Sequence, residues 1–160
     1  MLTVNVICVG KLKEKYWVDA LKEYSKRLSA FCKFSIVELP ECKTNGEPKE
    51  KEINHILQEE GKMILGKIKQ NDYTISMCIE GKNISSEALS DLMEDVKLQG
   101  KSTLNFVIGG SWGLSYEVKK ISSYKLSMGK MTFPHQMARV MVAEQIYRGF
   151  QISTNGKYHK

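Results

Sequence analysis

The sequence predicts an α/β fold: a mainly parallel sheet with helices on both of its faces. Short runs of β-branched and apolar residues alternate along the chain with longer segments whose apolar residues recur at helical spacing. The chain has 160 residues and 42% hydrophobic content, which suits one globular domain over residues 1–160. No repeat, proline-rich linker or low-complexity tract divides it.

The first half of the chain is expected to contain two strands, each followed by a helix. Residues 2–9 (LTVNVICV) and 34–39 (FSIVEL) are short apolar runs with β-branched residues, ended by a glycine and a proline. Apolar residues at helical spacing predict helices over residues 16–28 and 50–68, and two glycines weaken the second helix. Residues 41–48 are polar and rich in turn-forming residues, which indicates a loop.

The same alternation continues into the second half. Residues 73–79 (YTISMCI) and 103–108 (TLNFVI) are predicted strands, and residues 80–82 a turn. Between the strands, one of the serines at 85–86 is expected to cap a helix that runs to about Gln99. Gly100 follows directly and suits the end of that helix.

The C-terminal part is expected to contain a short helix, a strand or extended segment at residues 124–128, and a long final helix. Pro134 suits the first position of this last helix, which runs to about Gln151. Residues 153–160 form a tail, and a chain terminus usually frays unless it is held.

A glycine cluster, Gly109-Gly110-Ser111-Trp112-Gly113, directly follows a predicted strand. Glycines let the backbone approach a ligand, and ligands of parallel sheets bind outside the carboxyl ends of the strands. This cluster and the segment after Ser127 are therefore the first candidate sites; a tight strand-to-helix turn is the alternative interpretation of the cluster. The spacing is not G-x-G-x-x-G, and no Lys-Ser or Lys-Thr follows. Dinucleotide binding and P-loop phosphate binding are therefore disfavoured.

Charge and cysteine placement narrow the class of protein. The net charge of +6 and the pI near 9.1 favour a polyanionic partner such as nucleic acid. The four cysteines form no C-x-x-C pair and the three histidines lack metal-ligand spacing, so no metal site is predicted. The N-terminal run lacks a signal-peptide pattern and is too short to span a bilayer, which predicts a soluble, cytoplasmic protein without a membrane partner.

The final helix is apolar nearly all round, with Glu144, Arg148 and Gln151 as its clear polar strip. A helix of this kind is buried on more than one side, which in so small a domain predicts a subunit partner and hence a homodimer. Glu144 and Arg148 are four residues apart, the spacing of a helix salt bridge.

Arg139 and His135 are unusual residues for the start of this helix. Arg139 lies in an apolar stripe near the positive end of the helix dipole, where a cation is expected to have an anionic partner or a role at a site. A structural ion pair, or a side chain that extends to water, is the alternative. His135 lies at the helix N-terminus, which would lower its pKa, so it is either a neutral base or hydrogen-bond donor, or a structural residue.

The sequence is similar to a known family over its whole length. The residues that carry the similarity are FVIGG at 106–110 with GL at 113–114, MTFPHQ at 131–136, Arg139, EQIYR at 144–148, YHK at 158–160, VGKLK at 9–13, and Tyr24, Lys26, Arg27 and Leu28. Together they resemble the ribosomal RNA large-subunit methyltransferase H family.

The resemblance implies a SPOUT-class α/β methyltransferase with a trefoil knot in its C-terminal part, acting as a homodimer. It implies S-adenosylmethionine as the cofactor and N3 of a pseudouridine in helix 69 of 23S rRNA as the target, on the assembled 70S ribosome. Carried over residue by residue, the cofactor contacts fall on Met77, Gly109, Met128, Gly129, Lys130, Met131, Thr132 and Phe133. The C-terminal tail would reach an active site formed with the partner subunit.

Catalytic roles follow from this resemblance and the chemistry of N3 methylation. We expect Arg139 to stabilise the negative charge that develops on the base as N3 loses its proton. His159 or His135 is expected to accept that proton, and Tyr158 to orient the base or stack on it. Trp112 departs from the family pattern because it places a bulky ring inside the glycine cluster. The segment Met128-Gly129-Lys130 also departs from that pattern, and both departures could change the shape of the cofactor pocket.

Three alternatives remain at this point. A SPOUT enzyme could act on transfer RNA, or a protein of the same fold could bind the ribosome without catalysis. A small-molecule α/β module is the third, which the basic charge disfavours. Candidate rRNA contacts are the tail and three cations of the first helix, Lys22, Lys26 and Arg27.

Overall fold

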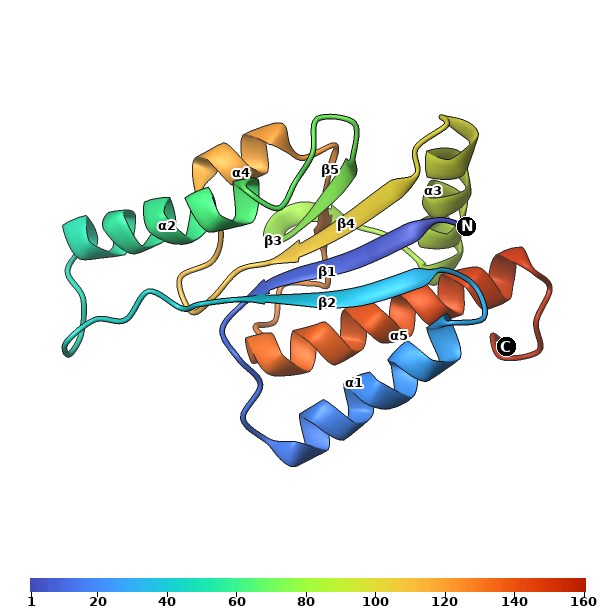
Figure 1. Ribbon diagram of the computed structural model, residues 1–160, viewed down its shortest axis with the longest axis horizontal. Coiled ribbons are helices and arrows are strands. Elements are labelled where there is room, and N and C mark those ends of the chain that lie inside the picture. Colours follow the sequence, from blue (N-terminus) through green and yellow to red (C-terminus); the bar gives the residue numbers. More distant parts are fainter.

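Five strands form one parallel sheet that lies between two layers of helices (Figure 1). The structure, a computed structural model, describes residues 1–160. The chain runs through β1 (Thr3–Val9), α1 (Lys15–Leu28), β2 (Lys33–Leu39), α2 (Glu50–Leu65), β3 (Tyr73–Asn83), α3 (Ser86–Leu98), β4 (Thr103–Ile108), α4 (Tyr116–Ile121), β5 (Tyr124–Ser127) and α5 (His135–Ser153). The strand order is β2-β1-β4-β3-β5, and every neighbouring pair is parallel. The predicted α/β class is confirmed.

The two faces of the sheet carry separate hydrophobic cores, because side chains alternate between the faces along each strand. On the larger side, Val6 and Phe106 belong to a cluster of 17 buried residues with α1, α3 and α5. On the smaller side, Ile7 and Val107 belong to a cluster of 7 with α2 and α4. Figure 1 shows α1 and α5 below the sheet and α2 and α4 above it. Helices therefore cover both faces, as predicted.

Strand β3 is longer than the sequence indicated. A turn was expected at residues 80–82, but β3 continues through them. Its pairing with β5 shifts register between Met77 and Lys82, so the residues between them leave the ladder as a bulge. A Cβ at Gly81 would lie 2.7 Å from the backbone of Leu126, so a glycine is needed where the bulge returns to β5.

The boundaries of the helices differ from the predicted ones by a few residues. Pro134 is the N-cap of α5, with extended backbone, and is not its first helical residue. Ser85 caps α3 as expected, because its hydroxyl accepts the amide of Ala88. Helix α2 ends at Leu65, before residue 68, and Gly66 is its C-cap.

The cysteines are all free thiols. Burial raises the pKa of Cys8 and of Cys32 to about 11, so both are protonated and unreactive at neutral pH. No group of three or more His, Cys, Asp and Glu side chains is placed to hold a metal ion. No helix combines the length and the apolar character that crossing a bilayer requires.

Candidate functional site

A cleft of about 470 Å³ lies at the carboxyl ends of β3, β4 and β5. Three segments form most of its wall: the β3 bulge at residues 77–80, the glycine loop at 108–114, and the connection from β5 to α5. The carboxyl edge of a parallel sheet is where ligands bind, because loops from neighbouring strands converge there. The two segments that the sequence indicated as candidate sites thus face one cavity.

The glycine loop after β4 depends on its missing side chains. Any Cβ on Gly109 would overlap the backbone of Gly113. Gly113 itself has a φ of 85°, a conformation that favours glycine, and its N–H donates to the carbonyl of Gly110 at 3.1 Å. Trp112 is 44% exposed and does not line the cleft. The indole ring therefore does not enter the cleft, and the glycines of the loop form this part of its wall.

Ser127, the last residue of β5, holds the start of the connection to α5. Its hydroxyl accepts the N–H of Gly129 at 3.1 Å, and Gly129 has a φ of 122°. The amide of Asn83 donates to the Ser127 carbonyl at 3.4 Å. Farther along, Met131 and Phe133 are 79% and 37% exposed at the cleft. Exposed apolar side chains beside a cavity provide a surface that a ligand could cover.

The cleft brings together all but one of the residues expected to contact a cofactor. Lys130 is the exception, since it is exposed and does not line the cavity. The expected residues that line it are Met77, Gly109, Met128, Gly129, Met131, Thr132 and Phe133. Sequence reasoning missed the bulge residues Cys78, Ile79 and Glu80, because it assigned part of that segment to a turn.

His135, the first residue of α5, also lines the cleft. Burial lowers its pKa, the positive charge of Arg139 lowers it further, and the negative charge of Glu41 opposes them. The imidazole is therefore neutral at pH 7 and able to accept a proton.

Arg139 is completely buried, and does not line the cleft. One guanidinium nitrogen lies 3.1 Å from the carboxylate of Glu38. The other donates to the carbonyls of Val9 and Gly10 at 2.9 and 2.8 Å. The expected anionic partner thus exists, and Arg139 joins α5 to the ends of β1 and β2. Glu38 gave no signal in the sequence, because its partner is 101 residues away.

Tyr158 and His159 lie along the C-terminal half of α5, and neither lines the cleft of its own chain. The guanidinium of Arg148 stacks 4.6 Å from the Tyr158 ring and contacts His159 Nδ1 at 3.1 Å. The predicted salt bridge from Arg148 to Glu144 is present at 2.6 Å. His159 Nε2 lies 2.6 Å from the carboxylate of Glu87, at the start of α3. The tail is therefore held, but away from the other candidate residues.

Two residues of α2 support the glycine loop from behind, and the sequence did not indicate either. Glu60 is buried, accepts the N–H of Cys42 at 3.0 Å, and keeps one carboxylate oxygen without a partner. Burial raises its pKa. A Cβ at Gly61 would lie 2.5 Å from the hydroxyl of Ser115, so the glycine that weakens α2 permits its contact with this loop.

The whole chain is similar to proteins of one kind. Residues 2–159 match the family model described as "Predicted SPOUT methyltransferase". A Clostridium perfringens protein named ribosomal RNA large subunit methyltransferase H 1 is 53% identical over 159 residues, which cover 99% of this chain and 100% of that protein. Proteins named ribosomal RNA large subunit methyltransferase H from Clostridium novyi and Clostridium botulinum are 52% and 50% identical, with the same coverage.

A solved structure is similar at the level of the fold. It is that of a probable methylase family protein from Haemophilus influenzae Rd KW20, with a TM-score of 0.53. The match covers 98% of this chain and 70% of that chain, at 11% sequence identity. At so low an identity the likeness concerns the arrangement of helices and strands alone.

Proposed function

This chain belongs to the SPOUT methyltransferase family, and on that premise we propose that it transfers a methyl group from S-adenosylmethionine to large-subunit ribosomal RNA. The names of relatives that are 50–53% identical over their full length support this substrate class. We further propose that the target is N3 of a pseudouridine in helix 69 of 23S rRNA, on the assembled 70S ribosome. With this substrate, we propose that the enzyme works in the cytoplasm.

The observation that carries the proposal is the convergence of the two family-like segments on one cleft. S-adenosylmethionine carries an adenine ring, a ribose and a charged amino-acid part, so it needs apolar walls together with backbone polar groups. The thioethers of Met77 and Met128 supply apolar wall, and the loops at Gly109 and Gly129 bring backbone to the cavity. The residues present therefore fit this cofactor.

Once bound, the cofactor supplies an electrophilic methyl group. The protein has to hold the acceptor nitrogen in line with that methyl, and positioning of this kind accounts for a large part of a rate enhancement. The proton on N3 has to leave, and we propose that the imidazole of His135 accepts it. The support is that His135 lines the cleft and has a lowered pKa, which keeps it neutral. His159 is the alternative base, carried by the tail.

Arg139 is the proposed source of positive charge for the base as it loses its proton. Its side chain is 0% exposed, so solvent screens its field poorly. It lies one helical turn after His135 and lowers the pKa of that imidazole. In this proposal it acts from behind Gly10, whose carbonyl it binds, and not by contact with the substrate.

We propose that the active unit is a homodimer in which Tyr158 and His159 reach the cleft of the partner. Along α5, the step from His135, which lines the cleft, to Arg148, which holds the tail, is about 20 Å at 1.5 Å per residue, so the tail is remote from its own cleft. The apolar side chains of Met137, Val140 and Met141 are only half-buried on α5, which leaves a surface for a second copy. Tyr158 would then orient the base in the partner's site.

The proposed trefoil knot would lie in the C-terminal part of the chain. The chain there crosses from one face of the sheet to the other, because α4 packs on the face with α2, whereas α5 packs on the opposite face with α1 and α3. Pulling single molecules by both ends tests the proposal. A knotted chain stretches to less than the full contour of about 3.5 Å per residue. An extension equal to that contour would disprove the knot.

The decisive experiment for the function is transfer of labelled methyl groups to 70S ribosomes, free 50S subunits and transfer RNA, followed by nucleoside mapping. The expected result is label in one pseudouridine of 23S rRNA, mainly with 70S ribosomes. Label in transfer RNA would establish the alternative SPOUT substrate. Cofactor binding without label in any RNA would favour a non-catalytic ribosome-binding protein.

A further inference from the structure

A second groove lies next to the methyl-transfer cleft, against α4 and β5. Its volume is about 500 Å³, and it differs from the cleft in being lined almost wholly by polar and charged side chains. The lining residues are Glu80, Tyr116, Lys119, Lys120, Ser122 and Lys125. Neither the family signatures nor the proposed chemistry accounts for this groove.

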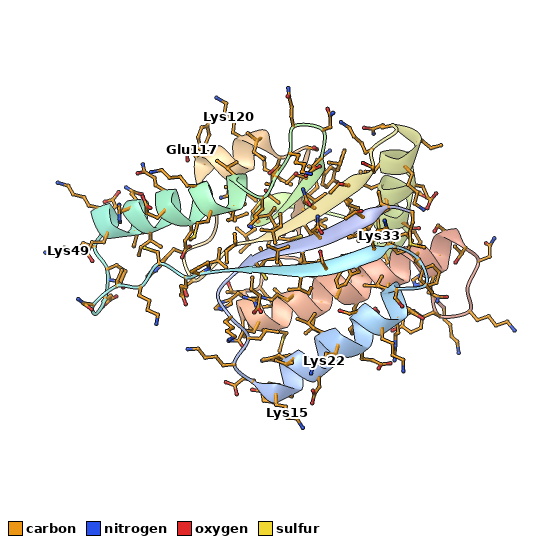
Figure 2. The ribbon with its side chains drawn as sticks, in the orientation of Figure 1. Lys15, Lys22, Lys33, Lys49, Glu117 and Lys120 are labelled. Atoms are coloured by element: carbon orange, nitrogen blue, oxygen red, sulfur yellow. The ribbon has the colours of Figure 1, made fainter.

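The positive charge of the groove is largely free. Lys119 forms an ion pair with Glu80 at 2.5 Å, and this contact is the main reason why the pKa of Glu80 is lowered. Lys120 and Lys125 are exposed, and no carboxylate lies within 4.0 Å of either ammonium group. Glu117, the one acidic residue of α4, lines a separate hollow toward α2. Figure 2 shows Lys120 pointing outward from α4.

Tyr116 adds an aromatic ring to this basic groove. It is 72% exposed, and no other aromatic side chain packs against it. An exposed ring beside free lysines is the combination that single-stranded nucleic acids use, because phosphates pair with the cations and bases stack on the ring.

The groove is continuous with the cleft. Glu80 and Lys119 line both cavities, so the β3 bulge and α4 form the boundary between them. A polymer that lies in the groove is therefore led toward the site at which the methyl group is transferred.

We propose that the groove binds the single-stranded RNA flanking the target nucleotide, with phosphates on Lys120 and Lys125 and one base stacked on Tyr116. This inference rests on the proposed function and adds to it the surface that holds the substrate. The alternative RNA-binding surface is formed by the cations of α1, among them Lys22 and Lys26. Helix α1 lies on the opposite face of the sheet from α4 in Figure 1, and Figure 2 labels Lys22 there.

The charge test compares two double variants with the same loss of charge. Lys120→Gln/Lys125→Gln removes two cations of the groove. Lys49→Gln/Lys51→Gln removes two exposed lysines at the start of α2, and Figure 2 shows Lys49 at the end of α2 that is remote from α4. Binding of a single-stranded oligouridine of about ten nucleotides is measured by fluorescence anisotropy at several salt concentrations. The groove variant should bind the oligouridine several-fold more weakly. Its plot of log binding constant against log salt concentration should be less steep by about 1.4, which corresponds to two lost phosphate contacts, and the control should match the parent protein.

The stacking test compares two tyrosines of similar exposure. Tyr116→Ala should weaken oligouridine binding about tenfold, and Tyr116→Phe should restore it, because the ring carries the stacking. Tyr16→Ala, at a ring that is 64% exposed on α1, should leave binding unchanged.

The outcomes separate this inference from the proposed function. Equal losses in the groove and α2 variants, or a loss only in Lys22→Gln/Lys26→Gln, would overturn the groove proposal. Selective loss in the groove variant supports it even when no RNA is methylated, and in that case the enzymatic proposal alone fails. Unchanged cofactor binding by calorimetry shows that each variant is folded.

Discussion

Helix α5 carries an arginine near each end, and the two are held in opposite ways. The side chain of Arg139 is 0% exposed, and its partners come from β1 and β2, more than 100 residues away in sequence. The side chain of Arg148 is 25% exposed, and its partners are Glu144, one turn earlier, and the tail. One arginine of this helix is therefore buried and joined to the sheet, whereas the other is partly exposed and contacts its own helix and the tail.

The contrast explains how one helix could serve two subunits. Partners that are distant in sequence exist only in the folded chain, so the contacts of Arg139 fix the position of α5 at the cleft. Contacts between Arg148 and the tail form at the surface, where solvent compensates their loss. In the proposed homodimer, the tail would exchange these contacts for those of another chain without unfolding the sheet.

The largest effect is expected from Arg139→Met. The change removes the donor to two buried carbonyls and leaves Glu38 without its cation, which should cost about 3 kcal/mol of the free energy of unfolding. Urea unfolding measures the loss. The matched change Arg148→Met should cost less than about 1 kcal/mol. Equal losses at the two positions would remove the distinction between the ends of α5.

A second change tests how tightly the C-terminal half of α5 packs against α3. A Cβ at Gly149 would lie 2.9 Å from the sulfur of the buried Met93, and the Gly149 carbonyl accepts the hydroxyl of Ser90 at 2.7 Å. Gly149→Ala should therefore destabilise the protein by about 1–2 kcal/mol through overpacking, measured by thermal or urea unfolding. A neutral or stabilising result would show that α3 and α5 can separate there at little cost.

The pH dependence of turnover tests the site at the N-terminal end. The folded-state pKa of His135 is lowered, so the unfolded chain binds more protons below the usual value of about 6.5. The contribution of the neutral imidazole to stability is therefore present above pH 6.5 and is lost as the pH falls through the lowered pKa. Single-turnover rates should show an acid limb below pH 6.5 that disappears in His135→Gln.

The smallest effect on stability is expected from Glu144→Gln, which weakens the salt bridge to Arg148. Unfolding free energy should fall by less than about 1 kcal/mol, because both side chains are partly exposed. The tail should nevertheless become more mobile, seen as faster amide exchange at residues 155–160. Gln58→Glu, an exposed charge change on α2, provides a comparison that should not affect the tail. Unaltered exchange in Glu144→Gln would mean that the contacts of His159 with Glu87 and Arg148 hold the tail without Glu144.

Local patterns in the sequence sufficed for most elements and for part of the site. Apolar runs predicted four strands, a strand or extended segment at residues 124–128, and a mainly parallel sheet, which the structure confirms. Glycines after strand ends pointed to Gly109 and the segment after Ser127, and both line the cleft. The strand order could not be predicted, because the alternation of strands and helices indicates that the strands are parallel but not which strands lie next to each other. The β3 bulge was missed because it depends on how Gly81 meets the backbone of β5.

Residues whose role depends on a distant contact were beyond sequence reasoning. Arg139 was identified as a cation in need of a partner, but nothing near Glu38 marked it as that partner. Glu60 and Gly61 acquire their role only when α2 lies against the glycine loop. The positions of Tyr158 and His159 depend on the folding back of a tail, which residue spacing does not encode.

The two outer strands of the sheet have a consequence for how the protein behaves at high concentration. Open strand edges invite pairing with other chains and hence fibre-like aggregation. Here the edge strand β5 is short, Tyr124–Ser127, and it pairs with β3 across a bulge. The other edge strand, β2, carries the charged side chains of Lys33 and Glu38. Neither edge offers a long flat ladder, so intermolecular sheet extension is disfavoured and copies that associate have to do so through their helices.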